Sequence, residues 1–166
     1  NETFLTENNI TKETALCSFI PNTYEVYWDI TPNNFNKKMH DEAKKFWNEN
    51  RLKKAKDLKL SKEQVISLAA IVQKETAKVD ERPKVAGVYM NRIKVGMLLQ
   101  ADPTVIYSKK LLENNFNQQI KRVLYKDLEL DSPYNTYKYA GIPPGPITMP
   151  DISSIDAVLN YEKHSY

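Results

Sequence analysis

The stretch from Ser61 to Thr76 constrains the fold of this chain more than any other. Its apolar side chains recur at helical spacing over a wide arc, namely Val65, Ile66, Leu68, Ala69, Ala70, Ile71 and Val72. A helix with so wide an apolar arc is buried on most sides. The pattern Ser61-x-x-Gln64 is a capping box, which marks the start of that helix. We therefore expect the chain to fold around this helix.

Local signals predict the other elements. Thr31-Pro32 begins a helix, and further helices are expected from Asp80 to a stop at Gly96, from Asp102 toward Leu112, and from Ser153 or Ser154 to Leu159. Residues 24–28, Tyr-Glu-Val-Tyr-Trp, are rich in the aromatic and β-branched types that favour a short strand. The expected fold class is α+β, mainly helical with a small β-sheet.

Residues 132–150 are expected to form an ordered loop. They hold 5 of the 9 prolines and 2 of the 4 glycines, together with Tyr134, Tyr137 and Tyr139. Repeated proline fixes φ, and tyrosine offers a large area for packing, whereas flexible linkers are rich in glycine and serine. This segment is predicted to have a rigid backbone that can form one side of a binding groove.

Composition excludes several classes of site. The 166 residues suit one domain, and a net charge of +3 is too small to indicate a nucleic-acid partner. Cys17 is the single cysteine and there are two histidines, so neither a disulfide nor a thiolate-rich or histidine-rich metal site is expected. No glycine-rich phosphate motif is present. We expect neither a metal nor a cofactor.

The segment from Lys37 to Lys62 is strongly basic. It has 10 Lys and Arg residues against four acidic ones. Two interpretations stay open, a solvated helix face and a contact with an anionic polymer or a membrane surface. No apolar run reaches the length of a membrane span, and no signal peptide opens the chain.

Glu75 is the candidate for acid chemistry. At 100° per residue it falls between Leu68 and Ile71, inside the apolar arc of the central helix. Burial favours the uncharged acid, which a general acid requires, although a buried ion pair is the alternative. Arg92 lies in the middle of the apolar face of the next helix. It is either a substrate contact or a clamp that pairs with Glu75 or Asp102.

Two polar segments predict a ligand groove. Gln100, Asp102 and Thr104 lie within five residues of one another and close to Tyr107. The second segment combines aromatic and amide side chains, namely Tyr134, Asn135 and Tyr137. Aromatic faces pack on sugar C–H surfaces, and amides and hydroxyls bind sugar hydroxyls. Together these residues predict a groove for a carbohydrate chain, although Asp102 could instead cap the helix that Pro103 begins.

The motifs in residues 16–166 resemble those of the endolytic murein transglycosylases, the YceG-like family. The resemblance is carried by the strings Leu68-Ala-Ala-Ile-Val-Gln-Lys-Glu-Thr76, Glu81-Arg-Pro83, Tyr89-Met-Asn-Arg92, Leu99-Gln-Ala-Asp-Pro-Thr-Val-Ile-Tyr107, Ser132-x-Tyr-Asn-Thr-Tyr137 and Gly141-Ile-Pro-Pro-Gly-Pro-Ile147. The resemblance implies a bacterial lyase that cuts nascent peptidoglycan strands at the β-1,4 bond between N-acetylmuramic acid and N-acetylglucosamine. Its product ends are 1,6-anhydro-muramic acid, and strand elongation stops there.

The resemblance also implies the roles of single residues. Glu75 matches the catalytic glutamate, while Gln73 stands where the family has the first glutamate of a Glu-x-Glu stretch. Arg92, Gln100, Asp102, Thr104, Tyr107, Tyr134, Asn135 and Tyr137 are the expected substrate-binding residues. A catalytically idle glycan-binding module and an aminodeoxychorismate-lyase-like enzyme remain as alternatives.

Domain organisation and location follow from the same resemblance. Residues 1–20 are expected to be a remnant of an upstream LysM-like region or an entry segment, and residues 21–166 a catalytic domain truncated at its C-terminus. The family implies a single-pass anchor in the bacterial cell membrane, by an N-terminal helix absent from this chain, with the catalytic domain on the extracytoplasmic side. The expected partners are glycan strands and a peptidoglycan synthase.

Overall fold

The structure, a computed structural model, describes residues 2–7 and 10–165. Within those residues there are helices, turns and loops, but no β-strand. The α-helices are α1 (Glu2–Glu7), α2 (Pro32–Phe46), α3 (Glu49–Asp57), α4 (Lys62–Glu75), α5 (Arg82–Lys94), α6 (Asp102–Leu112) and α7 (Ile152–Leu159). Short 3-10 helices are η1 (Ala15–Ser18), η2 (Val79–Glu81) and η3 (Tyr125–Glu129). The chain is thus all-helical in the part described.

The predicted α+β class is therefore wrong. Residues 23–27 have no regular structure, and the described residues provide no second strand for them to pair with. Tyr27 is 86% exposed and Trp28 is 99% exposed. Aromatic and β-branched residues favour an extended backbone, but a strand also needs a neighbour that pairs with it. The local composition favoured a strand and gave no information on a partner for it.

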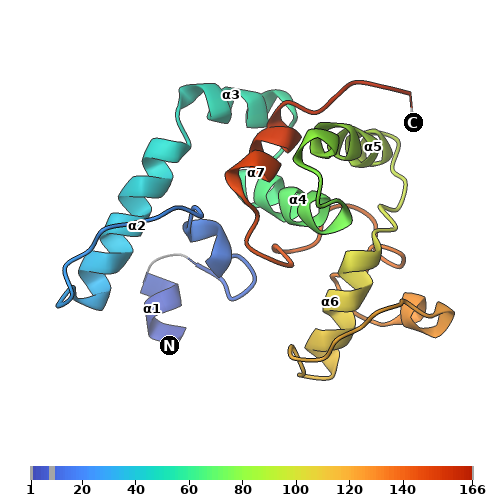
Figure 1. The fold of residues 1–166 in the computed structure, drawn as a ribbon, viewed down its shortest axis with the longest axis horizontal. Helices are drawn as coiled ribbons and strands as arrows, with labels where there is room; N and C mark the ends of the chain where they lie inside the picture. The colour runs from blue at the N-terminus through green and yellow to red at the C-terminus, as the bar shows by residue number, and fades with distance from the viewer. Residues whose placement is uncertain (1, 8–9, 166) are drawn as a thin grey trace.

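The helix predicted to be central is α4. Every residue from Val65 to Val72 is buried, and α4 packs against α3, α5, α6 and α7. Figure 1 shows α4, α5 and α7 together at the centre, with α2 and α6 extending to opposite sides. Because α4 is enclosed over most of its length, its two ends are the places where its side chains reach the surface.

Capping signals set most helix starts as the sequence predicts. Thr31 accepts a hydrogen bond from the Asn34 amide at the start of α2. Ser61 and Gln64 form the complete capping box of α4. Gly96 follows α5 with a φ of +71°, a left-handed conformation that glycine adopts without strain.

Two helix starts differ from the prediction. The segment that begins near Asp80 is first the 3-10 turn η2, and α5 starts at Arg82. The N-cap position of α7 is Asp151, not Ser153 or Ser154, and the Asp151 side chain makes no capping hydrogen bond. The amide of Asp151 donates to Oε1 of Gln73 at 2.5 Å, and the Ser154 hydroxyl lies 3.1 Å from the same oxygen. A side chain from α4 therefore completes this helix end, and local sequence carries no sign of that contact.

The proline-rich segment 132–150 is an ordered loop, as expected. Its residues form turns, and many of its side chains are buried. Gly145 packs so closely on the N-terminal segment that a Cβ there would lie 2.0 Å from the carbonyl oxygen of Glu13. The loop is thus held between the helical core and residues near Glu13. None of the described helices has the length and apolarity needed to cross a membrane.

Candidate active site

Glu75 is the last residue of α4 and is exposed. The prediction that it is buried in the apolar arc is wrong, because the elements that cover α4 enclose it only as far as Val72. A helical wheel gives the direction of a side chain but not the point at which the covering elements end. The carboxylate accepts a hydrogen bond from the Tyr89 hydroxyl at 3.2 Å. It is therefore an accessible carboxylate with one oxygen oriented by the protein.

Tyr89 connects Glu75 to the core. It lies on α5 and is 5% exposed. Burial raises the pKa of its hydroxyl, and the charge of Glu75 and the hydrogen bond to it raise the pKa further. Its hydroxyl therefore stays protonated at physiological pH and remains a donor to the carboxylate. Tyr89 stands in the motif Tyr89-Met-Asn-Arg92, but it is not among the site residues predicted from the sequence.

Arg92 lies one helical turn beyond Tyr89 and is half-buried. Its Nη1 donates to the carbonyl oxygen of Leu99 at 2.5 Å. Burial raises the pKa of both Tyr89 and Tyr137, and the charge of Arg92 offsets a small part of each increase, so Arg92 interacts electrostatically with both hydroxyls. In the part of the chain that the structure describes, no ion pair joins Arg92 to Glu75 or Asp102, so neither carboxylate completes the clamp considered from the sequence.

Asp102 and Tyr137 form the second half of the site. The Tyr137 hydroxyl donates to Oδ1 of Asp102 at 2.7 Å. Burial, followed by this hydrogen bond and the charge of Asp102, raises the pKa of Tyr137 to about 12, and the charge of Glu75 adds to the shift. The structure therefore brings the α4 end, α5, the α6 start and the 132–150 loop together at one place.

A cavity of about 220 Å³ opens beside the Asp102–Tyr137 pair. It is lined by Asp102, Arg122, Val123, Leu124, Tyr125, Leu128 and Tyr137. Arg122 is exposed, and Tyr125 is 91% exposed. The walls thus offer a carboxylate, a guanidinium and aromatic rings, which are the groups that bind a hydroxylated, partly anionic ligand. Arg122 and Tyr125 are not among the site residues predicted from the sequence, because the irregular segment 114–126 carries no motif.

Other predicted site residues lie inside the scaffold. Thr104 is fully buried, and its hydroxyl lies 2.8 Å from that of Thr136 and donates to the Ala101 carbonyl oxygen. Asn135 is also fully buried, and its Nδ2 donates to the carbonyl oxygens of Leu128 and Leu130. These side chains bind protein groups that hold the loop beside α6.

Three further residues complete the set. Tyr107 and Tyr134 pack ring against ring, with centroids 4.8 Å apart, and Tyr134 is only 5% exposed. Gln100 is exposed and has a φ of +51°. Its backbone N–H donates to the Thr136 carbonyl oxygen, so this contact does not use the side chain. Its side chain is therefore the one of these three that solvent reaches freely.

Gln73 does not face the site. Its Oε1 is used by the start of α7, so this position of the Glu-x-Glu-like stretch has a structural contact in this chain. Glu75 is the carboxylate of that stretch that stays accessible. Within residues 2–7 and 10–165, no three His, Cys, Asp or Glu side chains come together as potential metal ligands.

Comparison with known proteins identifies the family. A model of the YceG-like family matches residues 2–166. Over 108 residues, which are 65% of its length, this chain is 43% identical to the endolytic murein transglycosylase of Bacillus subtilis (strain 168). Over the same length it is 33% identical to the endolytic murein transglycosylase of Streptococcus pneumoniae (strain D39). These stretches make up 28% and 19% of the two relatives, so the chain spans a minor part of their length.

The fold is also that of a solved relative. A crystal structure of a yceG-like protein from Listeria monocytogenes aligns with a TM-score of 0.69 and 33% identity, over 87% of this chain and 45% of that one. The resemblance first noticed in the motifs is confirmed by these matches. Because the family model covers nearly every residue, the chain belongs to the YceG-like family.

Proposed function

We propose that this chain is the catalytic part of an endolytic peptidoglycan lytic transglycosylase, which cleaves the β-1,4 bond between N-acetylmuramic acid and N-acetylglucosamine. One observation carries the proposal most directly. Glu75 is exposed at the end of a buried helix, is oriented by Tyr89, and interacts electrostatically with Tyr137 of the neighbouring cavity wall. The relationship to endolytic murein transglycosylases supports the choice of substrate.

In the proposed reaction, a single carboxyl group serves as acid and then as base. Protonated Glu75 gives its proton to the glycosidic oxygen as the bond from that oxygen to the muramic C1 breaks. The C6 hydroxyl oxygen of the same muramic residue bonds to C1, and its proton passes to the Glu75 carboxylate. The acid is regenerated and the product is a 1,6-anhydro end.

A tethered nucleophile explains why one carboxylate is enough. Hydrolytic glycosidases use a second carboxylate as nucleophile or to activate water. Here the C6 hydroxyl is already held close to C1, and intramolecular attack needs no activated water.

The groups around the cavity are proposed to hold the strand. Asp102, Tyr137 and Gln100 would bind sugar hydroxyls, and Tyr125 would pack on a sugar face. Arg92 and Arg122 would bind the carboxylates of muramic acid or its stem peptide. Thr104, Tyr107, Tyr134 and Asn135 would act by supporting these groups. Because peptidoglycan lies outside the cell membrane, the proposed place of action is its extracytoplasmic side.

Replacement of Glu75 by Gln tests the proposal. The amide keeps the size of the side chain and removes its proton chemistry, so we expect formation of anhydro ends from purified glycan strands to fall about 10³-fold. Mass spectrometry of the strand ends is the measurement. Glu63→Gln is the matched control, because Glu63 is an exposed carboxylate in the first turn of the same helix. It should leave the rate unchanged.

Each possible result separates the alternatives. Activity retained in Glu75→Gln would exclude Glu75 as the acid. Ordinary reducing ends in place of anhydro ends would show hydrolysis. Strands bound but left intact by the wild-type protein would indicate a glycan-binding module.

A further inference from the structure

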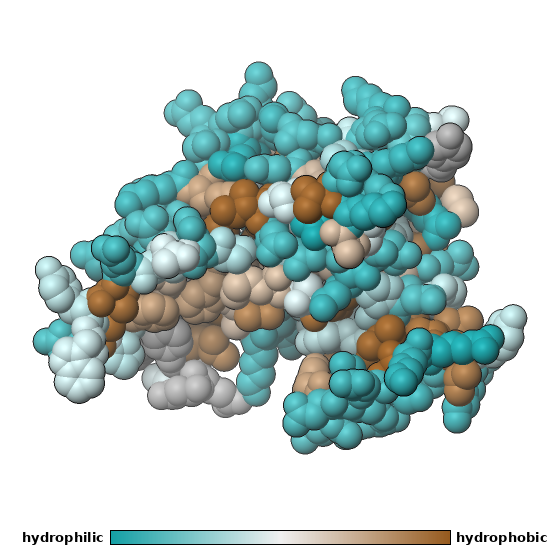
Figure 2. All heavy atoms as spheres, in the orientation of Figure 1, coloured by the Kyte–Doolittle hydropathy of each residue, from teal (hydrophilic) through white to brown (hydrophobic). Residues whose placement is uncertain are grey.

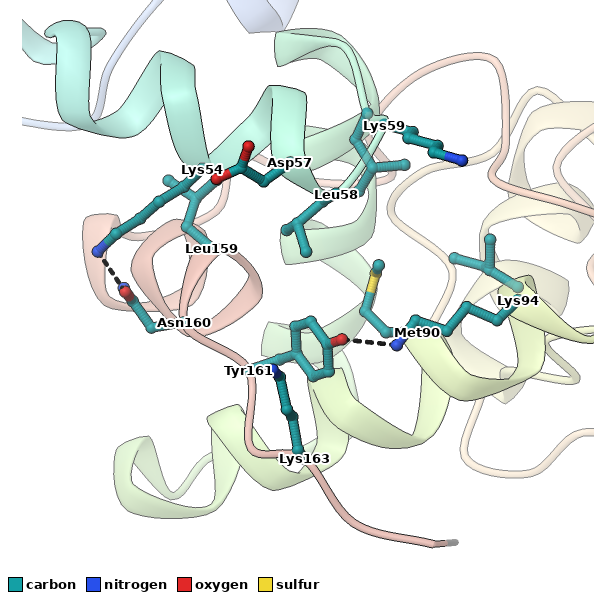
Figure 3. Close-up of a pocket in the computed structure, with 12 residues that line it drawn as sticks. Lys54, Asp57, Leu58, Lys59, Met90, Lys94, Leu159, Asn160, Tyr161 and Lys163 are labelled. Atoms are coloured by element: carbon teal, nitrogen blue, oxygen red, sulfur yellow. Dashed lines mark hydrogen bonds between the residues drawn. The ribbon is translucent and has the colours of Figure 1, made fainter.

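A second and larger cavity lies away from the candidate active site. It measures about 750 Å³ and is formed by the end of α3, the turn that leads into α4, the last turns of α5 and the segment that follows α7 (Figure 3). Pockets that hold small-molecule ligands have volumes of about 300–1,000 Å³. The cavity is therefore large enough for a ligand of its own.

Lysine dominates the charge of this cavity. Lys54, Lys59, Lys94 and Lys163 line it, with Asp57 as the one acidic lining residue. The whole chain has only three more basic than acidic residues, so the cavity holds an excess equal to that of the entire molecule. In Figure 2, hydrophilic side chains cover the upper edge of the molecule, where Figure 1 places α3. The electrostatic potential here favours an anion.

Two of the lysines are oriented and two are free to respond to a ligand. Lys54 donates to Oδ1 of Asn160 at 2.5 Å, and Lys94 donates to the Tyr161 hydroxyl at 2.7 Å. Each ammonium has three donors, so both keep donors for a ligand. Lys59 and Lys163 have no hydrogen bond or ion pair through their ammonium groups in the described part of the chain.

The floor of the cavity is apolar. Leu58 is partly exposed and lies between the lysines in Figure 3, together with Met90 and Leu159, which are buried and contribute little accessible area. Ile93 and the ring of Tyr161 extend this surface. A small inorganic anion would leave the floor in contact with water. A ligand that also carries an apolar body would cover it and gain from the apolar area removed from water.

The cavity is separate from the candidate active site. Helix α5 presents Tyr89 and Arg92 to the active site, whereas Met90, Ile93 and Lys94 line the cavity. On α4 the cavity lies next to Leu60, which precedes the first turn, while Glu75 ends the helix. At 1.5 Å per residue these ends are about 20 Å apart. One ligand group cannot contact both places.

We propose that this cavity binds a phosphate group carried on an apolar body, as in the headgroup region of an anionic lipid. Phosphate oxygens are strong acceptors for the ammonium donors of lysine. Lysine acts as a point charge toward phosphate and needs no bidentate geometry. The apolar body occupies the partly exposed floor formed by Leu58, Ile93 and Tyr161.

Binding of a short-chain lipid provides the test. The probe is monomeric dihexanoyl phosphatidylglycerol, and glycerol phosphate is the probe that lacks the apolar body. We expect saturable binding of the lipid by calorimetry, with the affinity for glycerol phosphate at least tenfold lower. Vesicles of phosphatidylglycerol and phosphatidylcholine add a third arm, in which co-sedimentation shows whether the headgroup is taken from a bilayer or only from a soluble molecule.

The key variant is the double replacement of Lys59 by Asn and Lys163 by Gln. Lys59 has a φ of +58°, and Asn tolerates that conformation, so the charge is removed with little strain. The matched control is Lys53→Gln with Lys56→Gln, which has the same net charge and alters exposed lysines of α3 that do not line the cavity. Affinity should fall at least tenfold in the first variant and less than twofold in the control.

Three results would overturn the proposal or part of it. Absence of saturable lipid binding, or equal affinities in the two double variants, would overturn it. Equal affinities for glycerol phosphate and the lipid would overturn the role of the apolar floor. Thermal unfolding of each variant confirms that the comparison is made between folded proteins.

Discussion

The two segments that bring polar groups to the candidate site, 102–104 and 135–137, each have an exposed part and a buried part. Asp102 is exposed, whereas Thr104, two residues later, is fully buried. Asn135 is fully buried, whereas Tyr137, two residues later, is partly exposed. Residues of similar polarity in the same short motif thus meet opposite environments.

The difference shows how the buried part positions the exposed part. The Thr104 and Thr136 hydroxyls lie 2.8 Å apart and join the two segments inside the protein. The Tyr137 hydroxyl then meets Asp102 at the surface, beside the cavity. The buried side chains are satisfied by protein groups, and the exposed ones keep hydrogen-bonding capacity for a ligand. We therefore expect the buried residues to control stability and the exposed ones to control activity.

Replacement of Asn135 by Ala should have the largest effect on stability. It removes the donors to the Leu128 and Leu130 carbonyl oxygens and the acceptor for the Tyr137 amide. Buried polar groups left without partners cost about 1–3 kcal/mol each. We expect the free energy of unfolding in urea to fall by about 3 kcal/mol. Asn117→Ala, at an exposed position, is the control and should change it by less than about 0.5 kcal/mol. Equal losses in both variants would contradict the buried role.

The Thr104–Thr136 contact comes next. Thr104→Val and Thr136→Val should each lower the free energy of unfolding by about 1–2 kcal/mol, because each removes one partner from a buried hydrogen-bond network. The double variant should lose less than the sum of the single losses, by at least about 0.5 kcal/mol. Urea unfolding of the four proteins measures this coupling. Strict additivity would show that the two hydroxyls do not stabilise each other.

Some of this arrangement follows from local sequence. The capping box at Ser61 and the apolar run from Val65 to Val72 predict α4 and its burial, because helix starts and helix faces depend on neighbouring residues. The Thr31-Pro32 start of α2 is of the same kind. The proline-rich loop was also predicted, since proline restricts its own backbone.

The parts that sequence could not supply depend on contacts between distant segments. The strand predicted near Tyr27 failed because no partner strand exists among the described residues. Glu75 was predicted to be buried, and its exposure depends on where the covering helices end. Arg122 and Tyr125 reach the site only through the path of an irregular segment. The contrast between buried Thr104 and exposed Asp102, two residues apart, has the same origin, because it depends on which distant segments pack over each of them.

Tyr137→Phe tests the exposed side of the comparison. The change removes one surface hydrogen bond to Asp102, so we expect the free energy of unfolding to change by less than about 1 kcal/mol. In the proposed function, formation of anhydro ends should fall about tenfold, because the hydroxyl orients Asp102 and contacts substrate. The control is Tyr139→Phe, since Tyr139 donates to Asp131 in a similar surface pair outside the cavity. Equal rates of anhydro-end formation in the two variants would show that the Tyr137 hydroxyl has no role in the reaction.

Replacement of the buried residue Asp127 is expected to have the smallest effect, and it tests the role of a buried side chain through the pH dependence of stability. Its buried carboxylate accepts from the Leu124 amide at 3.0 Å and from Nζ of Lys109 at 3.0 Å. These two hydrogen bonds, the backbone one first, hold the pKa of Asp127 below its usual value. Because the unfolded chain binds the proton more tightly, the carboxylate stabilises the fold above the unfolded pKa of about 3.9, and this stability is lost as pH falls through the lower folded pKa.

Comparison of the wild-type protein with Asp127→Asn should make this visible. At pH 7 the wild type should be more stable by about 1 kcal/mol, and the difference should shrink progressively below about pH 4. Thermal or urea unfolding from pH 7 to pH 2 gives the measurement. Lys109→Gln removes the weaker of the two hydrogen bonds that lower the pKa of Asp127. In the Lys109→Gln background, the stability difference between the protein that keeps Asp127 and its Asp127→Asn variant should depend less on pH but should not vanish, because the Leu124 amide still donates to Asp127. A difference that stays constant over the whole pH range would mean that Asp127 supports η3 by its shape and not by its charge.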